Sequence, residues 1–207
     1  KQADIGTAMG ISGTEVSKEA SDMILADDNF TSIQSAVEEG RSIFDNITKF
    51  IVWTLPTNVG EGLVILLAIF TGMKLPITPL QILYINMTTA IFLGFTLAFE
   101  PKEPNSMQLP PRDPKAPILT KSLMVKTIIV STFQLLGAYL LFYNQINNGA
   151  SIESARTVAV TVFVFIETAY LFNCRSLKNS IRHIGFLSNH YLIAGFLIMM
   201  VIQLTFI

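Results

Sequence analysis

The sequence contains few charged residues. Only 14% of its 207 residues are Asp, Glu, Lys or Arg, whereas 51% are hydrophobic. Soluble domains average about 25% charged residues, so this composition indicates a chain that lies largely in a membrane. The 14 basic residues nearly balance the 15 acidic ones, and no basic run carries interleaved aromatic residues. We therefore expect no nucleic-acid partner.

Cysteine and nucleotide-binding motifs are also scarce. The single cysteine, Cys174, excludes an internal disulfide and a cysteine-based metal cluster. Gly6, Gly10 and Gly13 lack the spacing of a dinucleotide-binding loop, and no Lys-Ser/Thr pair of a phosphate-binding loop follows them. The hydrophobic stretches begin about fifty residues into the chain and are too long for a secretory signal.

Long apolar runs make up the rest of the chain. A membrane span needs about 20 predominantly apolar residues. Five segments approach this length, namely residues 50–71, 77–99, 123–143, 157–172 and 191–207. Pro56 in the first segment, with Pro79 and Gly94 in the second, predicts kinks or local unwinding within the membrane.

The distribution of Lys and Arg predicts the orientation of these spans. Basic residues concentrate in the connections 100–122 and 175–190, and the alternate connections are poorer in them. Because basic loops face the cytoplasm, we expect the amino-terminal head there and the end of the chain outside. A multi-pass protein of the plasma membrane is the simplest expectation.

Residues 1–49 form a polar head with nine acidic and four basic residues. A strand over 3–9, a helix through Ser21 that begins with a Ser12/Glu15 capping box, and a strand over 23–25 indicate the end of an α/β domain. From Phe30 onward, apolar residues at helical spacing predict one helix that continues into the first span.

The predicted fold class is therefore mostly α, a polytopic transmembrane helix bundle preceded by the end of an α/β domain. The expected division is a cytoplasmic domain end over 1–29, a stalk helix over 30–49 and a transmembrane domain over 50–207.

Two carboxylates lie deep inside the predicted spans, Glu61 and Glu167. A charge at mid-bilayer costs about 2.5–3.5 kcal/mol on insertion scales, so such residues face an interior and often serve transport. Neither span offers Lys or Arg at a similar depth, which leaves a bound cation or a proton as the partner. Gln134 and Gln203 also lie in spans but have no neighbours of ligand type, so we expect them to form interhelical hydrogen bonds.

Further oxygen-bearing side chains accompany the carboxylates. Asn58 lies three residues before Glu61, and Asn86 lies three residues before Thr89, so each pair shares a helix face. Carboxylates, amides, hydroxyls and carbonyls are the ligands of hard cations. A cation site is the favoured interpretation, and hydrogen bonding between helices is the alternative for Asn58, Asn86 and Thr89.

Several segments resemble type II P-type cation-transporting ATPases. The resemblance rests on residues 3–10 and 13–16, ASDMILADDNF at 20–30, VEEGR at 37–41, NVGE at 58–61, QILYIN at 81–86 and VFIE at 164–167. It covers nearly the whole chain and implies the fifth to ninth spans of such a pump. The head then resembles the end of its haloacid-dehalogenase-like phosphorylation domain.

The resemblance also implies an activity and a ligand set. ATP and Mg²⁺ would be bound by parts that this chain lacks, so the chain carries no catalytic residue of its own. The partners would be membrane lipid and the transported cation. The implied cation ligands are Asn58 and Glu61 in the fifth span, Asn86 and Thr89 in the sixth, and Glu167 in the eighth.

One position departs from the pattern of the family. Ala90 stands where calcium and sodium/potassium pumps carry an Asp after the Thr. The ion therefore stays open among calcium, sodium, potassium, magnesium and a proton. Two alternatives to an ATP-driven pump also stay open, namely a passive cation channel or carrier and an inactive truncated membrane fragment.

Overall fold

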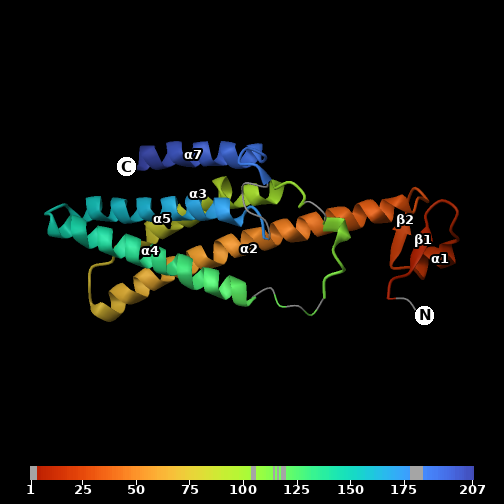
Figure 1. Cartoon of the computed structure of the whole chain (residues 1–207), viewed down its shortest axis with the longest axis horizontal. Coiled ribbons are helices and arrows are strands. Elements are labelled where there is room, and N and C mark those ends of the chain that lie inside the picture. Colours follow the sequence, from red (N-terminus) through yellow and green to blue (C-terminus); the bar gives the residue numbers. More distant parts are fainter. Residues whose placement is uncertain (1–3, 104–105, 114, 116, 118–119, 178–183) are drawn as a thin grey trace. The chain divides into compact units, whose positions relative to one another are not determined.

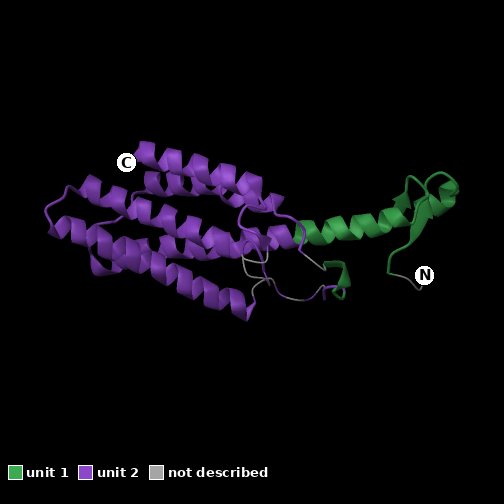
Figure 2. Ribbon diagram, turned by 45° about the horizontal axis from the view of Figure 1, so that its top comes forward, with its two compact units in different colours: residues 1–44, 104–110 green, residues 45–103, 111–207 purple. Residues whose placement is uncertain are grey.

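The computed structural model describes residues 4–103, 106–113, 115, 117, 120–177 and 184–207. It divides into two compact units, residues 1–44 with 104–110 and residues 45–103 with 111–207 (Figure 2). The elements follow the order β1 (Thr7–Met9), α1 (Glu15–Glu19), β2 (Met23–Leu25), α2 (Thr31–Thr71), α3 (Pro79–Phe92), η1 (Gly94–Phe99), η2 (Ser106–Gln108), α4 (Lys121–Asn147), α5 (Ile152–Cys174) and α7 (His190–Phe206) (Figure 1).

The head unit contains a β-α-β element. Strands β1 and β2 pair in parallel, with Ala8 opposite Ile24, and α1 connects them. A Cβ at Gly10 would lie 2.7 Å from the Leu25 carbonyl oxygen, so this glycine permits a close approach of the two strand ends. Its role is packing, which agrees with the missing phosphate-binding spacing.

Helix α1 begins later than the sequence predicts. Its N-cap is Thr14, whose hydroxyl accepts a hydrogen bond from the amide of Ser17. The predicted Ser12 cap is wrong because the Ser12 amide donates instead to the Asp28 carboxylate, 2.8 Å away, and this bond holds Ser12 in the preceding turn.

The second unit is a helix bundle, which confirms the mostly helical prediction. Among the residues that the structure describes, four segments are long and apolar enough to cross a membrane, namely Thr31–Thr71, Pro79–Phe99, Lys121–Asn147 and Ile152–Cys174. The fifth predicted span corresponds to α7, whose 17 residues extend over about 26 Å, slightly less than the hydrocarbon core of about 30 Å.

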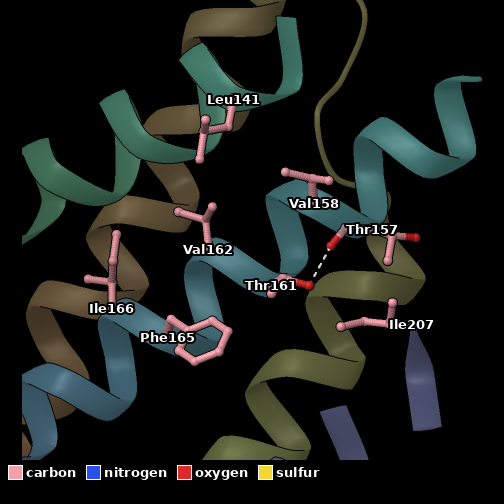
Figure 3. A pocket seen from close by; sticks show the side chains of 8 residues that line it. All are labelled: Leu141, Thr157, Val158, Thr161, Val162, Phe165, Ile166 and Ile207. Carbon is pink, nitrogen blue, oxygen red and sulfur yellow. Dashed lines mark hydrogen bonds between the residues drawn. The ribbon is translucent and has the colours of Figure 1, made fainter. Parts of the chain in front are cut away.

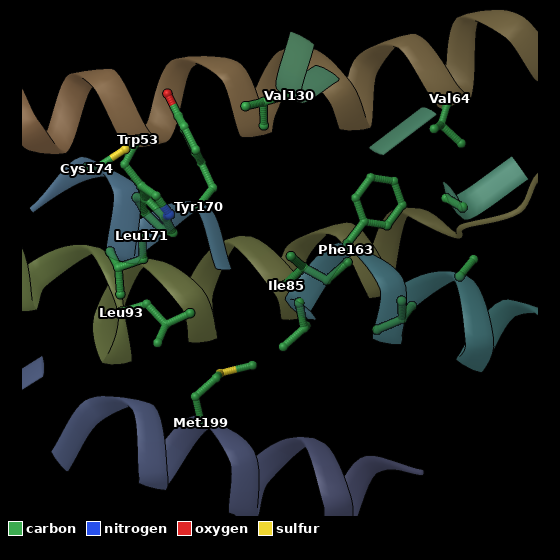
Figure 4. Packing of buried hydrophobic residues seen from close by; sticks show 14 of the residues in the cluster. Trp53, Val64, Ile85, Leu93, Val130, Phe163, Tyr170, Leu171, Cys174 and Met199 are labelled. Atoms are coloured by element: carbon green, nitrogen blue, oxygen red, sulfur yellow. The ribbon is translucent and has the colours of Figure 1, made fainter. Parts of the chain in front are cut away.

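Apolar side chains from all the long helices form the core of this unit. Ile85 of α3, Phe163 of α5 and Met199 of α7 are buried members of this core (Figure 4). Many large apolar side chains on the outer helix faces are exposed instead, with Phe70 84% and Leu80 75% exposed. Such outer faces suit contact with lipid.

The two prolines of the first spans do not unwind their helices. Helix α2 runs without interruption through Pro56. The Val52 carbonyl, which Pro56 leaves without its helical donor, accepts a hydrogen bond from the Tyr170 hydroxyl at 3.0 Å. Pro79 occupies the first turn of α3, behind a capping box of Thr78 and Gln81, where its missing N–H has no cost.

The break predicted at Gly94 is confirmed. Helix α3 ends at Phe92, and the 3₁₀ helix η1 begins at Gly94. A Cβ at Gly94 would lie 2.5 Å from the Trp53 ring and 2.8 Å from the Phe50 ring. The glycine therefore allows η1 to pack closely against α2.

A buried polar network joins one set of helix ends. The Arg175 guanidinium, at the C-cap of α5, donates to both carboxylate oxygens of Glu100 at 2.8 and 3.3 Å. Asn189, the N-cap of α7, donates to the same carboxylate, and Asn46 of α2 donates to the Glu100 backbone carbonyl. Arg175 also donates to the carbonyls of Gly185 and Phe186. One ion pair thus connects α2, η1, α5 and α7.

The substitution Arg175→Met should lower the free energy of unfolding by about 3–5 kcal/mol, because it leaves the Glu100 carboxylate buried without its cation. Thermal unfolding in detergent measures the loss. The double variant with Glu100→Gln should recover part of it. As a control, Glu15→Gln removes an exposed ion pair with Lys18 and should cost at most about 1 kcal/mol. Equal effects of Arg175→Met and Glu15→Gln would contradict this prediction.

The head unit should lose stability in acid through Asp28. Hydrogen bonds from Ser12 and then Ile11 hold the pKa of Asp28 below its ordinary value of 3.8. A lowered folded-state pKa contributes stability above 3.8, which disappears as the pH falls through the folded-state value. The protection of the Ile11 and Ser12 amides against hydrogen exchange, relative to the intrinsic rate at each pH, should therefore fall below about pH 4, and Asp28→Asn should flatten this dependence. Identical pH profiles of the two proteins would exclude Asp28 as the cause.

Candidate functional site

The two intramembrane carboxyl groups meet inside the bundle. Glu61 of α2 is 4% exposed and Glu167 of α5 is 2% exposed, and their carboxyl groups lie close enough to interact electrostatically. The ion pairs found among the described residues include neither of them. Two carboxylates in contact at low dielectric repel strongly, so this pair requires a proton or a cation.

Helix α3 supplies the predicted amide and hydroxyl. The Asn86 side-chain amide donates to Glu61 Oε2 at 2.7 Å and to the Ile82 carbonyl at 3.2 Å. Thr89, one turn later, is buried and contacts the Glu167 carboxyl. Their spacing of three residues places both on the face of α3 that meets the carboxylates, as the sequence predicts.

The structure does not bring Asn58 into this cluster. Its side chain is exposed, and its amide donates to the Thr54 carbonyl of the same helix at 2.9 Å. Among the described residues, no hydrogen bond joins it to either carboxylate. Its role as a cation ligand therefore stays a prediction.

Gln134 of α4 belongs to the cluster, although its position in the sequence did not predict this. The side chain is 0% exposed, and its Nε2 lies 3.5 Å from Glu167 Oε1 as donor. A Cβ at Gly60 would overlap the Gln134 side chain, so the glycine before Glu61 makes room for it. The expected interhelical hydrogen bond is present, but it is made to a carboxylate of the candidate site.

A tryptophan fixes the backbone beside the carboxylates. Trp53, the one tryptophan of the sequence, donates from Nε1 to the Glu167 carbonyl at 3.0 Å. The Tyr170 bond to Val52 lies one turn further along α5. These two bonds hold α5 against α2 next to the Glu61–Glu167 pair.

Two oxygens of the cluster have no hydrogen-bond donor. Within the part of the chain that the structure describes, Oε1 of Glu61 and Oε1 of Gln134 are both buried and unpaired. A buried acceptor without a partner costs about 1–3 kcal/mol, more when it is charged. These two oxygens are therefore available to accept a proton or to coordinate a cation.

The oxygen atoms of the cluster limit which ions it could bind. Among the described residues, no group of three or more His, Cys, Asp or Glu could hold a metal ion. The cluster instead combines two carboxylates with amide and hydroxyl oxygens. Oxygen ligands without sulfur or imidazole suit hard cations and not zinc or copper.

A separate cavity of about 420 Å³ lies between α4, α5 and the end of α7 (Figure 3). Val162, Phe165 and Ile207 are among its lining residues. Because this lining contains no carboxylate or amide side chain, the cavity does not extend the cluster.

The chain is similar to known cation-transporting ATPases. The family model described as "Cation transporting ATPase, C-terminus" matches residues 74–207. The chain is 57% identical, over 94% of its length, to the probable cation-transporting ATPase F of Mycobacterium tuberculosis, of which it covers 22%. It is 42% identical over 87% of its length to a cation-transporting ATPase of Synechocystis, covering 20% of that protein. For the calcium-transporting ATPase of Bacillus subtilis, the identity is 39% over the whole chain and 23% of the relative.

The chain thus spans about a fifth of the length of the relatives it matches. The matched family region includes Asn86, Thr89, Gln134 and Glu167, and the longer alignments to the relatives take in nearly the whole chain. Together with the apolar helices, these similarities establish a multi-pass membrane protein. The chain belongs to the family of cation-transporting ATPases.

Proposed function

We propose that this chain forms the ion-binding membrane part of a P-type ATPase that uses ATP to move a cation across a membrane. The observation that carries the proposal is the buried contact between Glu61 and Glu167, which has no basic partner among the described residues. The relatives are named as ATPases, which disfavours the passive channel or carrier.

The cluster binds a cation by replacing its water shell with protein oxygens. Glu61 and Glu167 supply the negative charge, and Thr89 supplies a hydroxyl beside Glu167. The Asn86 amide donates to Glu61 Oε2 and so holds that carboxylate in one orientation, leaving Oε1 for the ion.

Departure of the cation has a direct electrostatic consequence. Two carboxylates left in contact inside the bundle repel each other, so release must bring in protons or separate α2 from α5. Either response links ion occupancy to helix position. Proton counter-transport is therefore a natural companion of cation export in this site.

Helix α2 is the element that connects the site to the energy source. It runs from Thr31 to Thr71 without interruption and includes residues of both compact units. In the complete pump, ATP and Mg²⁺ would be bound by parts outside this chain, where ATP would phosphorylate an Asp. A change in those parts would reach Glu61 through this helix.

The proposal also covers the identity of the transported ion and the membrane in which the protein lies. A relative in Bacillus subtilis is named as a calcium transporter, whereas Ala90 provides no further carboxylate. A single divalent ion, or a monovalent ion with a proton, balances two carboxylates. The basic connections favour a cytoplasmic head, and the plasma membrane is the simplest expectation for the membrane.

Substitution of Glu61 tests the proposal. In the complete pump, Glu61→Gln should raise the cation concentration that gives half-maximal ATPase activity by about tenfold or more, since it removes one unit of charge from the site. The measurement is ATPase activity in detergent, titrated with calcium, magnesium, sodium and potassium. Glu153→Gln, an exposed carboxylate on α5, is the matched control and should change nothing. Equal activation curves for wild type and Glu61→Gln would refute the site.

An insertion into α2 tests the coupling. Two glycines inserted between Ser35 and Ala36, both exposed, rotate and lengthen the helix by about 200° and 3 Å. Phosphorylation by ATP should persist, whereas cation-dependent transport into vesicles should be lost. The control replaces Ser35 and Ala36 with glycine and keeps the length of the helix. Coupled transport in the insertion variant would show that α2 does not carry the signal.

A further inference from the structure

We propose that Gln134 of α4 is an additional ligand of the transported cation, which it binds through its side-chain oxygen Oε1. This inference rests on the proposed function and deepens it. It adds a fourth helix, α4, to the three helices that carry Glu61, Asn86, Thr89 and Glu167.

The orientation of the Gln134 amide follows from its neighbours. Its nitrogen faces Glu167 Oε1 at 3.5 Å, where an amide oxygen would meet a carboxylate oxygen and be repelled. Rotation of the amide by 180° is therefore unfavourable. The oxygen is left on the other side of the amide, buried and without a donor among the described residues.

The position of this oxygen is fixed by Gly60. A Cβ at Gly60 would overlap Gln134 Oε1, so the oxygen lies against α2 at the residue directly before Glu61. Another buried oxygen without a donor, Glu61 Oε1, belongs to that adjacent residue. In the described part of the bundle, no protein group donates a hydrogen bond to either oxygen. One cation bound between them would interact with both.

Gln203 shows what an ordinary buried glutamine looks like in the same bundle. It is 2% exposed, its Oε1 accepts from the Tyr84 hydroxyl at 3.2 Å, and its Nε2 donates to Thr161 at 2.9 Å. Both ends of Gln203 are satisfied by neighbouring helices. Only the nitrogen of Gln134 has a hydrogen-bond partner. This difference from Gln203 favours a ligand role for Gln134 over a role in joining helices.

A neutral amide ligand has a definite chemical effect. It adds a coordinating oxygen without adding charge, so the site keeps the two negative charges of Glu61 and Glu167. This combination suits one hard cation with several oxygen ligands.

The experiment compares Gln134→Leu, Gln134→Asn and the control Gln203→Leu in the complete pump, with ATPase activity titrated against each cation. Gln134→Leu keeps the volume and removes the oxygen, and Gln134→Asn retracts it by one methylene. Both should raise the half-maximal cation concentration by about tenfold, the equivalent of one charge-assisted contact. Gln203→Leu should leave that concentration unchanged while lowering thermal stability.

A second readout distinguishes a ligand from a structural residue. Saturating cation should raise the unfolding temperature of the wild type and of Gln203→Leu, and should raise that of the Gln134 variants much less. Half-maximal concentrations within about twofold of wild type in either Gln134 variant would overturn the inference and leave the amide as a hydrogen-bond donor only. If Gln134→Leu fails to fold, Gln134→Asn decides alone. Absence of cation stimulation in the wild type would instead refute the proposed function.

Discussion

The contact between Glu61 and Glu167 is the constraint on which the rest of the bundle depends. Burying one carboxylate is costly, and burying two in contact is stable only with a positive charge between or upon them. Helices α2 and α5 are nevertheless held together at this point by Trp53, which bonds the Glu167 carbonyl, and by Tyr170, which bonds the Val52 carbonyl. The apolar core thus maintains an arrangement that the carboxylates alone would oppose.

A third buried carboxylate in the same unit has different hydrogen-bond partners. Glu100 is saturated by Arg175 and Asn189, so it fixes helix ends and has no capacity left for an ion. Glu61 keeps an unpaired oxygen. The contrast separates a saturated ion pair at the helix ends from a carboxylate inside the bundle that keeps an unpaired oxygen.

The sequence predicted the elements better than it predicted their contacts. Apolar runs located the five long helices in the described part of the bundle, and helical spacing placed Asn86 and Thr89 on one face. The predicted unwinding at Pro56 was wrong, because Tyr170, 114 residues further along the chain, donates to the Val52 carbonyl that Pro56 leaves without its helical donor. The predicted Ser12 cap was wrong for a similar reason. The carboxylate of Asp28, 16 residues further along the chain, accepts the hydrogen bond of the Ser12 amide.

Site membership also depends on contacts between distant residues. Glu61 and Glu167 were identifiable because a charge in a span is unusual by itself. Gln134 was not, because an isolated glutamine in a span is common and its neighbour Gly60 lies on another helix. Asn58 shows the opposite case, a residue with the right chemistry and spacing whose amide is satisfied by its own helix.

Equilibrium binding of the cation to the complete pump without ATP tests the central role of the carboxylate pair most directly. Wild type and Glu153→Gln should show the same saturable binding, whereas Glu167→Gln should lose it, since either half of the pair is insufficient alone. Saturable binding of unchanged affinity in Glu167→Gln would contradict a cation site between Glu61 and Glu167.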